Sequence, residues 1–228
     1  MEYKYNKMNY LHKVIKIIKY GSANFILRVE RNNIKFLPGQ FFSIGVPGVP
    51  INREYSVSSG VNENYLDFLI REIKEGVLST KLKNLKKDDQ IKILGPYGEF
   101  YLKEFNINKK YNFFASGSGL SPFLSIIRSF KNLNYNIFHG IRLFEDIYTE
   151  SELKNYNIFI SRPVTGEKYN SVNIYNGRIT SNLEIIKKFI SPSDLFFICG
   201  NNLMINDVYN YLEKNNIKNS NIYSELFF

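Results

Sequence analysis

The segment YNFFASGSGLSP (residues 111–122) joins a short apolar run, 111–115, to Gly117-Ser118-Gly119 and to a stretch with helical spacing, 120–131. A strand followed by a glycine turn and a helix is the opening unit of a doubly wound α/β domain. Glycines there let the backbone approach a phosphate, which free N–H groups at the helix start bind. Pro122 replaces the last glycine of the G-x-G-x-x-G pattern, so a plain strand–helix turn is the alternative interpretation.

Strands and helices alternate through the rest of the C-terminal half. The expected strands are 111–115, 135–141, 156–161, 195–199 and 222–226, and the expected helices are 120–131, 179–189 and 204–215. Alternation of this kind predicts a parallel, doubly wound sheet with helices on its faces.

The N-terminal half has another rhythm. Short β-branched and aromatic runs, separated by turn residues, occupy 13–18, 24–30, 40–46, 54–58, 65–73 and 90–94, with one helical stretch at 77–85. Six short strands with regular turns predict a small antiparallel β-barrel. The polar stretch 103–110 suits a linker. We therefore expect two domains, 1–104 and 110–228.

Composition excludes several kinds of site. The chain has 228 residues, a formal net charge of +9, one cysteine and two histidines. One cysteine cannot form an internal disulfide, and so few cysteines and histidines cannot hold an iron–sulfur cluster or most zinc sites. The basic residues form no block, which argues against nucleic acid. No run of 18 apolar residues and no signal-peptide core are present, so we expect a cytoplasmic protein without a membrane span, although a removed transit peptide stays open.

Arginines follow successive elements of the second half. Arg142 comes directly after the strand 135–141, where an NAD-binding domain places an acid on the ribose 2′-hydroxyl. A guanidinium instead suits a 2′-phosphate. Ser161-Arg162 ends the next strand and Arg178 precedes the next helix. The three arginines are expected to converge on one anion; scattered surface arginines are the alternative.

The string Arg53-Glu54-Tyr55-Ser56 places a cation, an aromatic ring and a hydroxyl on one predicted strand. Arg53 and Tyr55 share a face, whereas Ser56 points to the other. A flavin requires such groups, for its pyrophosphate, its ring and its reactive nitrogen. A half-buried barrel strand is the alternative. Gly76-Val77-Leu78-Ser79 opens the helical stretch and suits either a phosphate or an ordinary N-cap.

Two further features are ambiguous. Cys199-Gly200-Asn201 follows a buried strand and opens a helix, so Cys199 is either a small core side chain or a slim group beside a planar ring. The chain ends in Phe227 and Phe228, whose exposure would be costly, so they are expected to pack on a core groove or on a flavin face.

Taken in order, these motifs resemble the ferredoxin–NADP reductases, especially the bacterial ferredoxin/flavodoxin reductase branch. The resemblance covers essentially the whole chain. Besides the strings quoted above, it includes Pro38-Gly39-Gln40-Phe41 and Gly95-Pro96-Tyr97-Gly98.

The resemblance implies two cofactors, FAD and NADP(H). The FAD residues it implies are Arg53, Glu54, Tyr55, Ser56, Val77, Leu78, Ser79, Ser118, Phe227 and Phe228. The NADP residues it implies are Gly117, Gly119, Arg142, Ser161, Arg162, Arg178, Cys199, Gly200 and Asn201. Ser56, Cys199 and Phe228 are implied as catalytic, with no metal.

Within these sets the resemblance implies particular roles. Arg53 pairs with the pyrophosphate, Tyr55 stacks on the flavin and Ser56 hydrogen-bonds near N5. The departures are Ser118, where many relatives carry Thr, and a terminal Phe in place of Tyr or Trp, which keeps the stacking area without the polar group. Which terminal Phe stacks is open.

The implied activity is an FAD-dependent ferredoxin/flavodoxin–NADP(+) reductase. Hydride passes between nicotinamide C4 and flavin N5, and single electrons pass to a carrier. The charge of +9 fits an acidic ferredoxin or flavodoxin. We expect a monomer. The alternatives are a free-flavin or NADH-dependent reductase of the same superfamily, and a non-catalytic basic binding protein.

Overall fold

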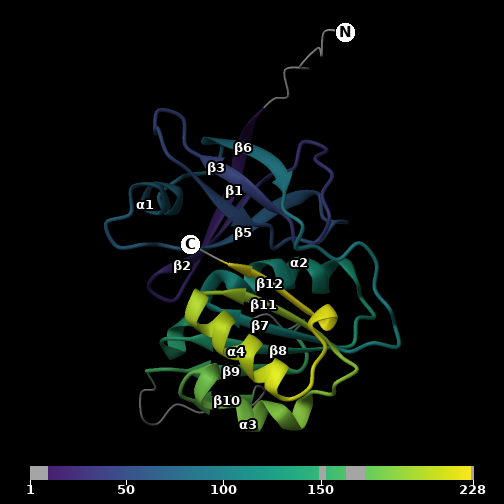
Figure 1. Ribbon diagram of the computed structural model, residues 1–228. Helices are drawn as coiled ribbons and strands as arrows, with labels where there is room; N and C mark the ends of the chain where they lie inside the picture. Colours follow the sequence, from purple (N-terminus) through teal and green to yellow (C-terminus); the bar gives the residue numbers. More distant parts are fainter. Residues whose placement is uncertain (1–9, 149–152, 163–172, 227–228) are drawn as a thin grey trace.

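A computed structural model describes residues 10–148, 153–162 and 173–226. The chain forms two sheet domains stacked one above the other, the first in the purple and blue of Figure 1 and the second in teal, green and yellow. Among the described helices, none is both long enough and apolar enough to cross a membrane.

The first domain is antiparallel. Its elements are β1 (Leu11–Tyr20), β2 (Asn24–Glu30), β3 (Phe41–Gly45), β4 (Asn52–Ser56), β5 (Tyr65–Arg71), α1 (Val77–Lys83) and β6 (Gln90–Tyr97). The strand order is β4-β3-β6-β1-β2-β5. A bridge between Val57 and Phe68 brings the ends of this order together, which curls the sheet into a barrel. Phe25, Phe42 and Phe68 fill its core.

The second domain is parallel. Its strands are β7 (Tyr111–Ser116), β8 (Tyr135–Ile141), β9 (Tyr156–Ile160), β10 (Asn173–Asn176), β11 (Leu195–Gly200) and β12 (Ile222–Leu226), in the order β10-β9-β8-β7-β11-β12. Its helices are η1 (Gly117–Leu120), α2 (Ser121–Ser129), η2 (Phe144–Asp146), η3 (Ile179–Ser181), α3 (Leu183–Ile186), η4 (Lys187–Phe189), α4 (Asn202–Lys214) and η5 (Asn219–Asn221). The order reverses between β7 and β11, and ligands of such sheets bind at the carboxyl ends beside that reversal.

This architecture confirms the predicted fold class, an antiparallel barrel followed by a doubly wound parallel sheet. The helix predicted at 120–131 is found as α2, preceded by the 3-10 turn η1. Two other details of the prediction were wrong. The helix predicted at 179–189 is divided into η3, α3 and η4. The short edge strand β10 was not expected, because its polar sequence NIYN leaves it largely exposed.

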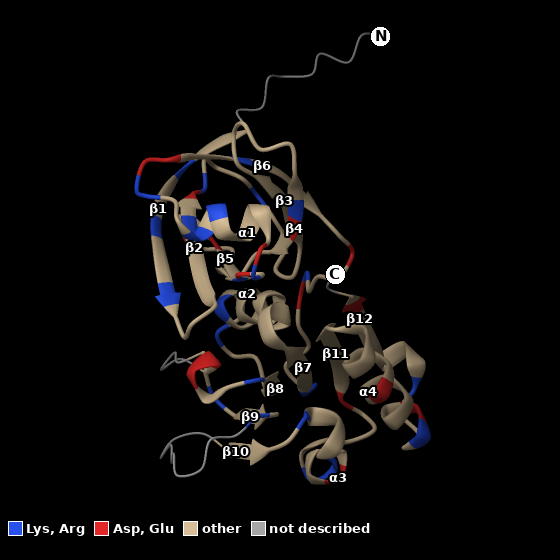
Figure 2. Ribbon diagram, turned by 90° about the vertical axis from the view of Figure 1, so that its left-hand side faces the viewer, with Lys and Arg blue, Asp and Glu red and all other residues tan. Residues whose placement is uncertain are grey.

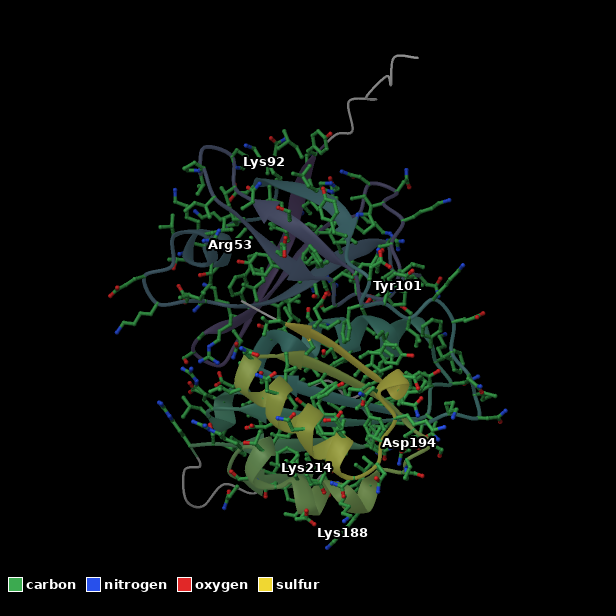
Figure 3. The ribbon with its side chains drawn as sticks, viewed as in Figure 1. Arg53, Lys92, Tyr101, Lys188, Asp194 and Lys214 are labelled. Atoms are coloured by element: carbon green, nitrogen blue, oxygen red, sulfur yellow. The ribbon has the colours of Figure 1, made fainter. Side chains whose placement is uncertain are left out.

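The amino ends of the parallel strands are held by buried amides. Asn136 donates to Asn112 at 2.7 Å, and Asn112 donates to Asp194 at 3.0 Å. Asp194 lies at the lower right of the second domain in Figure 3. This network satisfies polar groups at the end of the sheet opposite to the carboxyl ends of its strands.

Helix α2 joins the two domains. Ser121 Oγ donates to the backbone oxygen of Ser56 at 2.8 Å, and Ser125 Oγ donates to that of Ser59 at 2.8 Å. Arg128 Nη1 donates to the Ser58 oxygen, also at 2.8 Å. Two residues four apart on a helix share a face, so one side of α2 binds the chain segment that follows β4. The domains are thereby held together beside Ser56.

Candidate functional site

Two cavities meet where the domains join. The larger, about 1020 Å³, lies between β4, the start of α1 and the end of β12. The smaller, about 490 Å³, lies at the carboxyl ends of β7, β8, β9 and β11. Ser118 and Arg71 line both cavities, so a ligand in one borders a ligand in the other. Small-molecule sites usually occupy roughly 300–1,000 Å³, and both cavities are of this order.

Strand β4 forms one wall of the larger cavity. Arg53, Glu54, Tyr55 and Ser56 all line it. Figure 3 shows Arg53 on the side of the first domain that α1 also occupies, and its side chain is exposed. Tyr55 is half-buried, and burial raises the pKa of its phenol to about 12, so the ring stays neutral. A guanidinium and a neutral aromatic ring therefore face the same space, as predicted from their spacing.

The start of α1 forms another wall. Val77, Leu78 and Ser79 line the cavity, and Gly76 precedes them as the N-cap. Ser79 Oγ already accepts a hydrogen bond from the backbone N–H of Ile73 at 3.0 Å. Leu78 is buried, whereas Val77 is exposed. The structure thus brings this predicted segment to the same cavity as β4. One lone pair of the Ser79 hydroxyl already holds the loop at Ile73.

Two buried oxygens, Ser56 Oγ and Glu225 Oε2, lie on the wall of the larger cavity and make no hydrogen bond of good geometry with the described residues. Burial raises the pKa of Glu225 to about 7, the nearby Glu54 carboxylate acts in the same direction, and the Ser56 hydroxyl, which is close enough to interact with Glu225, acts against them. The hydroxyl and the carboxyl are therefore neighbours on the cavity wall, where both can hydrogen-bond a ligand. The groups present fit a flavin nucleotide, which brings donors, acceptors and a flat ring.

The smaller cavity gathers the predicted arginines. Arg142, Ser161, Arg162 and Arg178 all line it, and the backbone N–H of Arg162 donates to the Arg142 oxygen at 2.9 Å. Within the described part of the chain these three arginines form no salt bridge. With Arg71 they make four cationic side chains on a wall whose single acid is Asp207, a balance of +3. A cavity of this charge selects an anionic ligand.

The glycine turn stands between the cavities. Gly117 has a φ of +54°, a left-handed conformation in which a Cβ is strained, although a Cβ there would meet no neighbour. Gly119 is buried against the backbone of Cys199, so its role is close packing of η1 on β11. Gly117 and Gly200 line the smaller cavity, whereas Gly119 does not.

Cys199 and Asn201 differ in whether they reach the smaller cavity. Cys199 is completely buried in the core, and it lines neither cavity. Burial raises the pKa of its thiol well above the ordinary value. Asn201 lines the smaller cavity and caps α4 by accepting from the Met204 N–H at 3.0 Å. The structure therefore brings Asn201 to the smaller cavity, whereas Cys199 lies in the core and does not reach the cavity wall.

The predicted terminal aromatics, Phe227 and Phe228, lie outside the described residues. The three residues before them, Ser224, Glu225 and Leu226, line the larger cavity. In Figure 1 the strand β12 that carries them ends against the first domain. The end of the described chain therefore reaches the cavity that holds Arg53 and Tyr55.

Sequence reasoning missed two residues of the site, Arg71 and Glu225. Arg71 ends β5, lines both cavities and lies 3.8 Å from Asp146 of the second domain. Its position at the end of a strand that leads to Gly76 and α1 could have predicted that it reaches this cavity. Glu225 gave none, because an acid near a chain end is normally solvated.

Comparisons with known proteins agree with this geometry. A model of the oxidoreductase FAD-binding domain matches residues 13–101, and one of the oxidoreductase NAD-binding domain matches residues 113–210. The flavodoxin/ferredoxin–NADP reductase of Buchnera aphidicola subsp. Baizongia pistaciae is 32% identical over 224 residues, which cover 89% of each chain. The toluate 1,2-dioxygenase electron transfer component of Pseudomonas putida is 28% identical over 207 residues.

Coverage differs between these relatives. The match to the toluate dioxygenase component covers 86% of this chain but 60% of the relative, so this chain spans less than two thirds of that protein. A solved ferredoxin NADP+ reductase from Neisseria gonorrhoeae, with bound FAD and NADP, superposes with a TM-score of 0.80 at 22% identity. That match covers 96% of this chain and 98% of the other, and it shows a common fold. The chain therefore belongs to the ferredoxin–NADP reductase-like family of oxidoreductases, which bind FAD and a nicotinamide nucleotide.

Proposed function

We propose that this protein is an FAD-dependent reductase that transfers electrons between NADPH and a ferredoxin or flavodoxin. One observation carries the proposal. Three arginines without salt bridges among the described residues converge on a cavity that shares Ser118 with the larger, flavin-sized cavity. A nicotinamide nucleotide bound to these arginines in the smaller cavity would therefore lie next to the ligand of the larger cavity.

In this proposal residues 1–104 hold FAD, which supplies the chemistry of accepting a hydride and releasing electrons singly. Arg53 pairs with the pyrophosphate and Tyr55 lies against the ring. Ser56 and Glu225 offer their neighbouring side-chain oxygens to polar atoms of the ring system. Val77, Leu78 and Ser79 hold the phosphates at the start of α1. The ring is thus oriented by groups that are fixed before it binds.

Residues 110–228 hold NADPH. Arg142, Arg162 and Arg178 bind the 2′-phosphate with Ser161 beside them, since guanidinium groups bind phosphate with two parallel hydrogen bonds. Ser161 Oγ donates its one hydrogen to the Ile141 oxygen at 3.2 Å, and in this proposal the hydroxyl rotates to donate to the phosphate, which only accepts. Gly117, Ser118, Gly200 and Asn201 border the rest of the nucleotide.

The proposed partner is an acidic one-electron carrier. The net charge is +9, and Figure 2 shows Lys and Arg on both domains. Complementary charge steers association at low ionic strength, so carrier reduction is expected to slow as salt is added. The name of the Buchnera relative mentions ferredoxin and flavodoxin. We also propose a cytoplasmic monomer.

A second candidate is an NADH-dependent electron transfer component. It is favoured by the 28% identity to the toluate dioxygenase component across 86% of this chain. The absence of an acid after β8, where Arg142 stands, opposes it.

The test is to load the purified protein with FAD and to follow flavin absorbance after adding NADPH or NADH. We expect a yellow protein that NADPH bleaches at far lower concentration than NADH. Dye reduction and then ferredoxin or flavodoxin reduction complete the assay. A protein that stays colourless with FAD would overturn the proposal, and one that prefers NADH would favour the second candidate.

A further inference from the structure

A buried chain of hydrogen bonds ends on the glycine turn. His139 lies on β8 and is 2% exposed. Its Nε2 lies 2.9 Å from the backbone oxygen of Gly117, and its Nδ1 lies 2.7 Å from the hydroxyl of Tyr156 on β9. Neither side chain lines the smaller or the larger cavity, so both contact the glycine turn from the side away from these cavities.

The chemistry of the neighbours fixes which nitrogen carries the proton. A carbonyl only accepts, so Nε2 must donate its N–H to Gly117. Nδ1 then accepts from the Tyr156 hydroxyl, whose oxygen takes a backbone hydrogen bond from Tyr148. Burial lowers the pKa of His139 to about 4, so the ring keeps this neutral form near pH 7. The direction of every bond in the chain is therefore determined.

The glycine turn needs such a restraint. Gly117 has no side chain, its φ is +54°, and a Cβ placed there would touch nothing within 4 Å. Glycine populates both signs of φ readily, so the residue itself does little to hold the peptide that follows it. The Gly117 carbonyl opens the 3-10 turn η1, and the contact from His139 adds a side-chain restraint on it.

Holding the carbonyl also orients the next N–H. In a planar trans peptide the C=O of Gly117 and the N–H of Ser118 point to opposite sides. A carbonyl directed to His139 therefore turns the Ser118 N–H away from His139, and Ser118 lines both cavities. Ser118 lies in the first turn of η1, where backbone N–H groups lack partners inside the helix.

We infer that His139 is a positioning residue, which holds the Gly117–Ser118 peptide so that its N–H faces the nucleotide at the border of the two cavities. The inference rests on the proposed function, because it assumes that a nicotinamide nucleotide occupies the smaller cavity. It assigns His139 no contact with the nucleotide. The part of the nucleotide that the Ser118 N–H would contact runs from the pyrophosphate to the nicotinamide, and the arginines bind the opposite end.

The variants His139→Gln and His139→Asn separate this role from general packing. The amide nitrogen of Gln reaches about as far as Nε2 and can still donate to Gly117, whereas that of Asn reaches only as far as Nδ1. Both are polar and similarly costly to bury. On the FAD-loaded protein, titration with NADP+ monitored by flavin absorbance gives the dissociation constant. We expect Asn to raise it on the order of tenfold, the effect of one misplaced hydrogen bond to a charged ligand, and Gln about twofold.

Two control measurements separate the effect on the glycine turn from a general loss of structure. Adenosine 2′-monophosphate should bind wild type and both variants equally, because it needs only the arginine wall. Tyr156→Phe, which keeps the bond to Gly117, should change NADP+ affinity less than threefold, and this comparison still tests the inference if the Asn variant fails to fold.

Equal NADP+ affinity for Gln and Asn would overturn the inference. So would a tenfold loss in Tyr156→Phe, or a parallel loss for adenosine 2′-monophosphate. A wild-type protein that binds FAD but not NADP+ would instead overturn the proposed function.

Discussion

The two cavities share a border but recognise their ligands by different means. The smaller has four arginines and one acid on its wall, whereas the larger sets Arg53 and Arg71 against Glu54 and Glu225. The larger also presents the neighbouring buried oxygens of Ser56 and Glu225. From this difference we infer that the smaller cavity selects its ligand by charge, and the larger by shape and hydrogen bonds. Salt and charge-removing substitutions should therefore weaken one far more than the other.

The largest effect is expected from removing the charge of the smaller cavity. The combined variant Arg142→Ala, Arg162→Ala and Arg178→Ala should raise the KM for NADPH by on the order of 100- to 1,000-fold, since hydrogen bonds to charged groups contribute about 1.5–3 kcal/mol each and losses at one shared phosphate are less than additive. The KM for NADH should change less than about threefold, because NADH lacks the 2′-phosphate. Steady-state kinetics with both nucleotides measure this.

A matched control removes the same charge elsewhere. Lys92, Lys188 and Lys214 are exposed, and Figure 3 shows Lys92 on the first domain and Lys188 and Lys214 at the bottom of the second. Replacing all three by Ala should leave the NADPH preference unchanged. If the lysine variant loses as much NADPH affinity as the arginine variant, the smaller cavity does not select by its own charge.

A smaller effect is expected at the larger cavity. Arg53→Ala should weaken FAD binding by roughly 10- to 100-fold, the loss of one charge-assisted contact among many. The remaining affinity should vary little with salt, since most of the contact is apolar and hydrogen-bonded. Fluorescence titration of the apoprotein with FAD gives both values, with Lys92→Ala as the control. An unchanged dissociation constant would remove Arg53 from the cofactor site.

The smallest effect concerns Glu225, whose pKa is raised from 4.5 to about 7 mainly by burial. Between these values the folded protein binds more protons than the unfolded chain, so its free energy of unfolding falls as the pH rises. Glu225→Gln should abolish that fall. Because the carboxyl is partly exposed, the difference is discounted to on the order of 1–2 kcal/mol. Urea unfolding at pH 5, 6, 7 and 8 measures it, and parallel curves for the two proteins would contradict the raised pKa.

The sequence predicted the elements that have a clear period. Alternating short runs before residue 97 and strand–helix repeats after residue 111 indicated the two sheets, and β8 and β12 occur at the predicted residues. It failed at 173–176, because NIYN is too short and polar to show a strand period. Helix 179–189 was also predicted as continuous, since sequence periodicity does not distinguish a helix from a series of short turns.

The site was predictable where function follows position along the chain. Arg142, Arg162 and Arg178 follow strand ends, and parallel strands bring those ends together. Arg71 and Glu225 depend on how one domain sits on the other, which no local pattern contains. His139 gave no signal either, because the contacts of a buried side chain come from packing. For Cys199 the sequence left two interpretations, and the fold places it in the core.

The most direct test of the account is the affinity of the FAD-loaded protein for NADP+ and NAD+ at two ionic strengths. A cavity that selects by charge predicts NADP+ binding at least about 100-fold tighter than NAD+ at low salt, with the ratio falling as salt is added. Equal affinities, or a preference for NADP+ that salt does not alter, would contradict the assignment of the arginine wall to the 2′-phosphate.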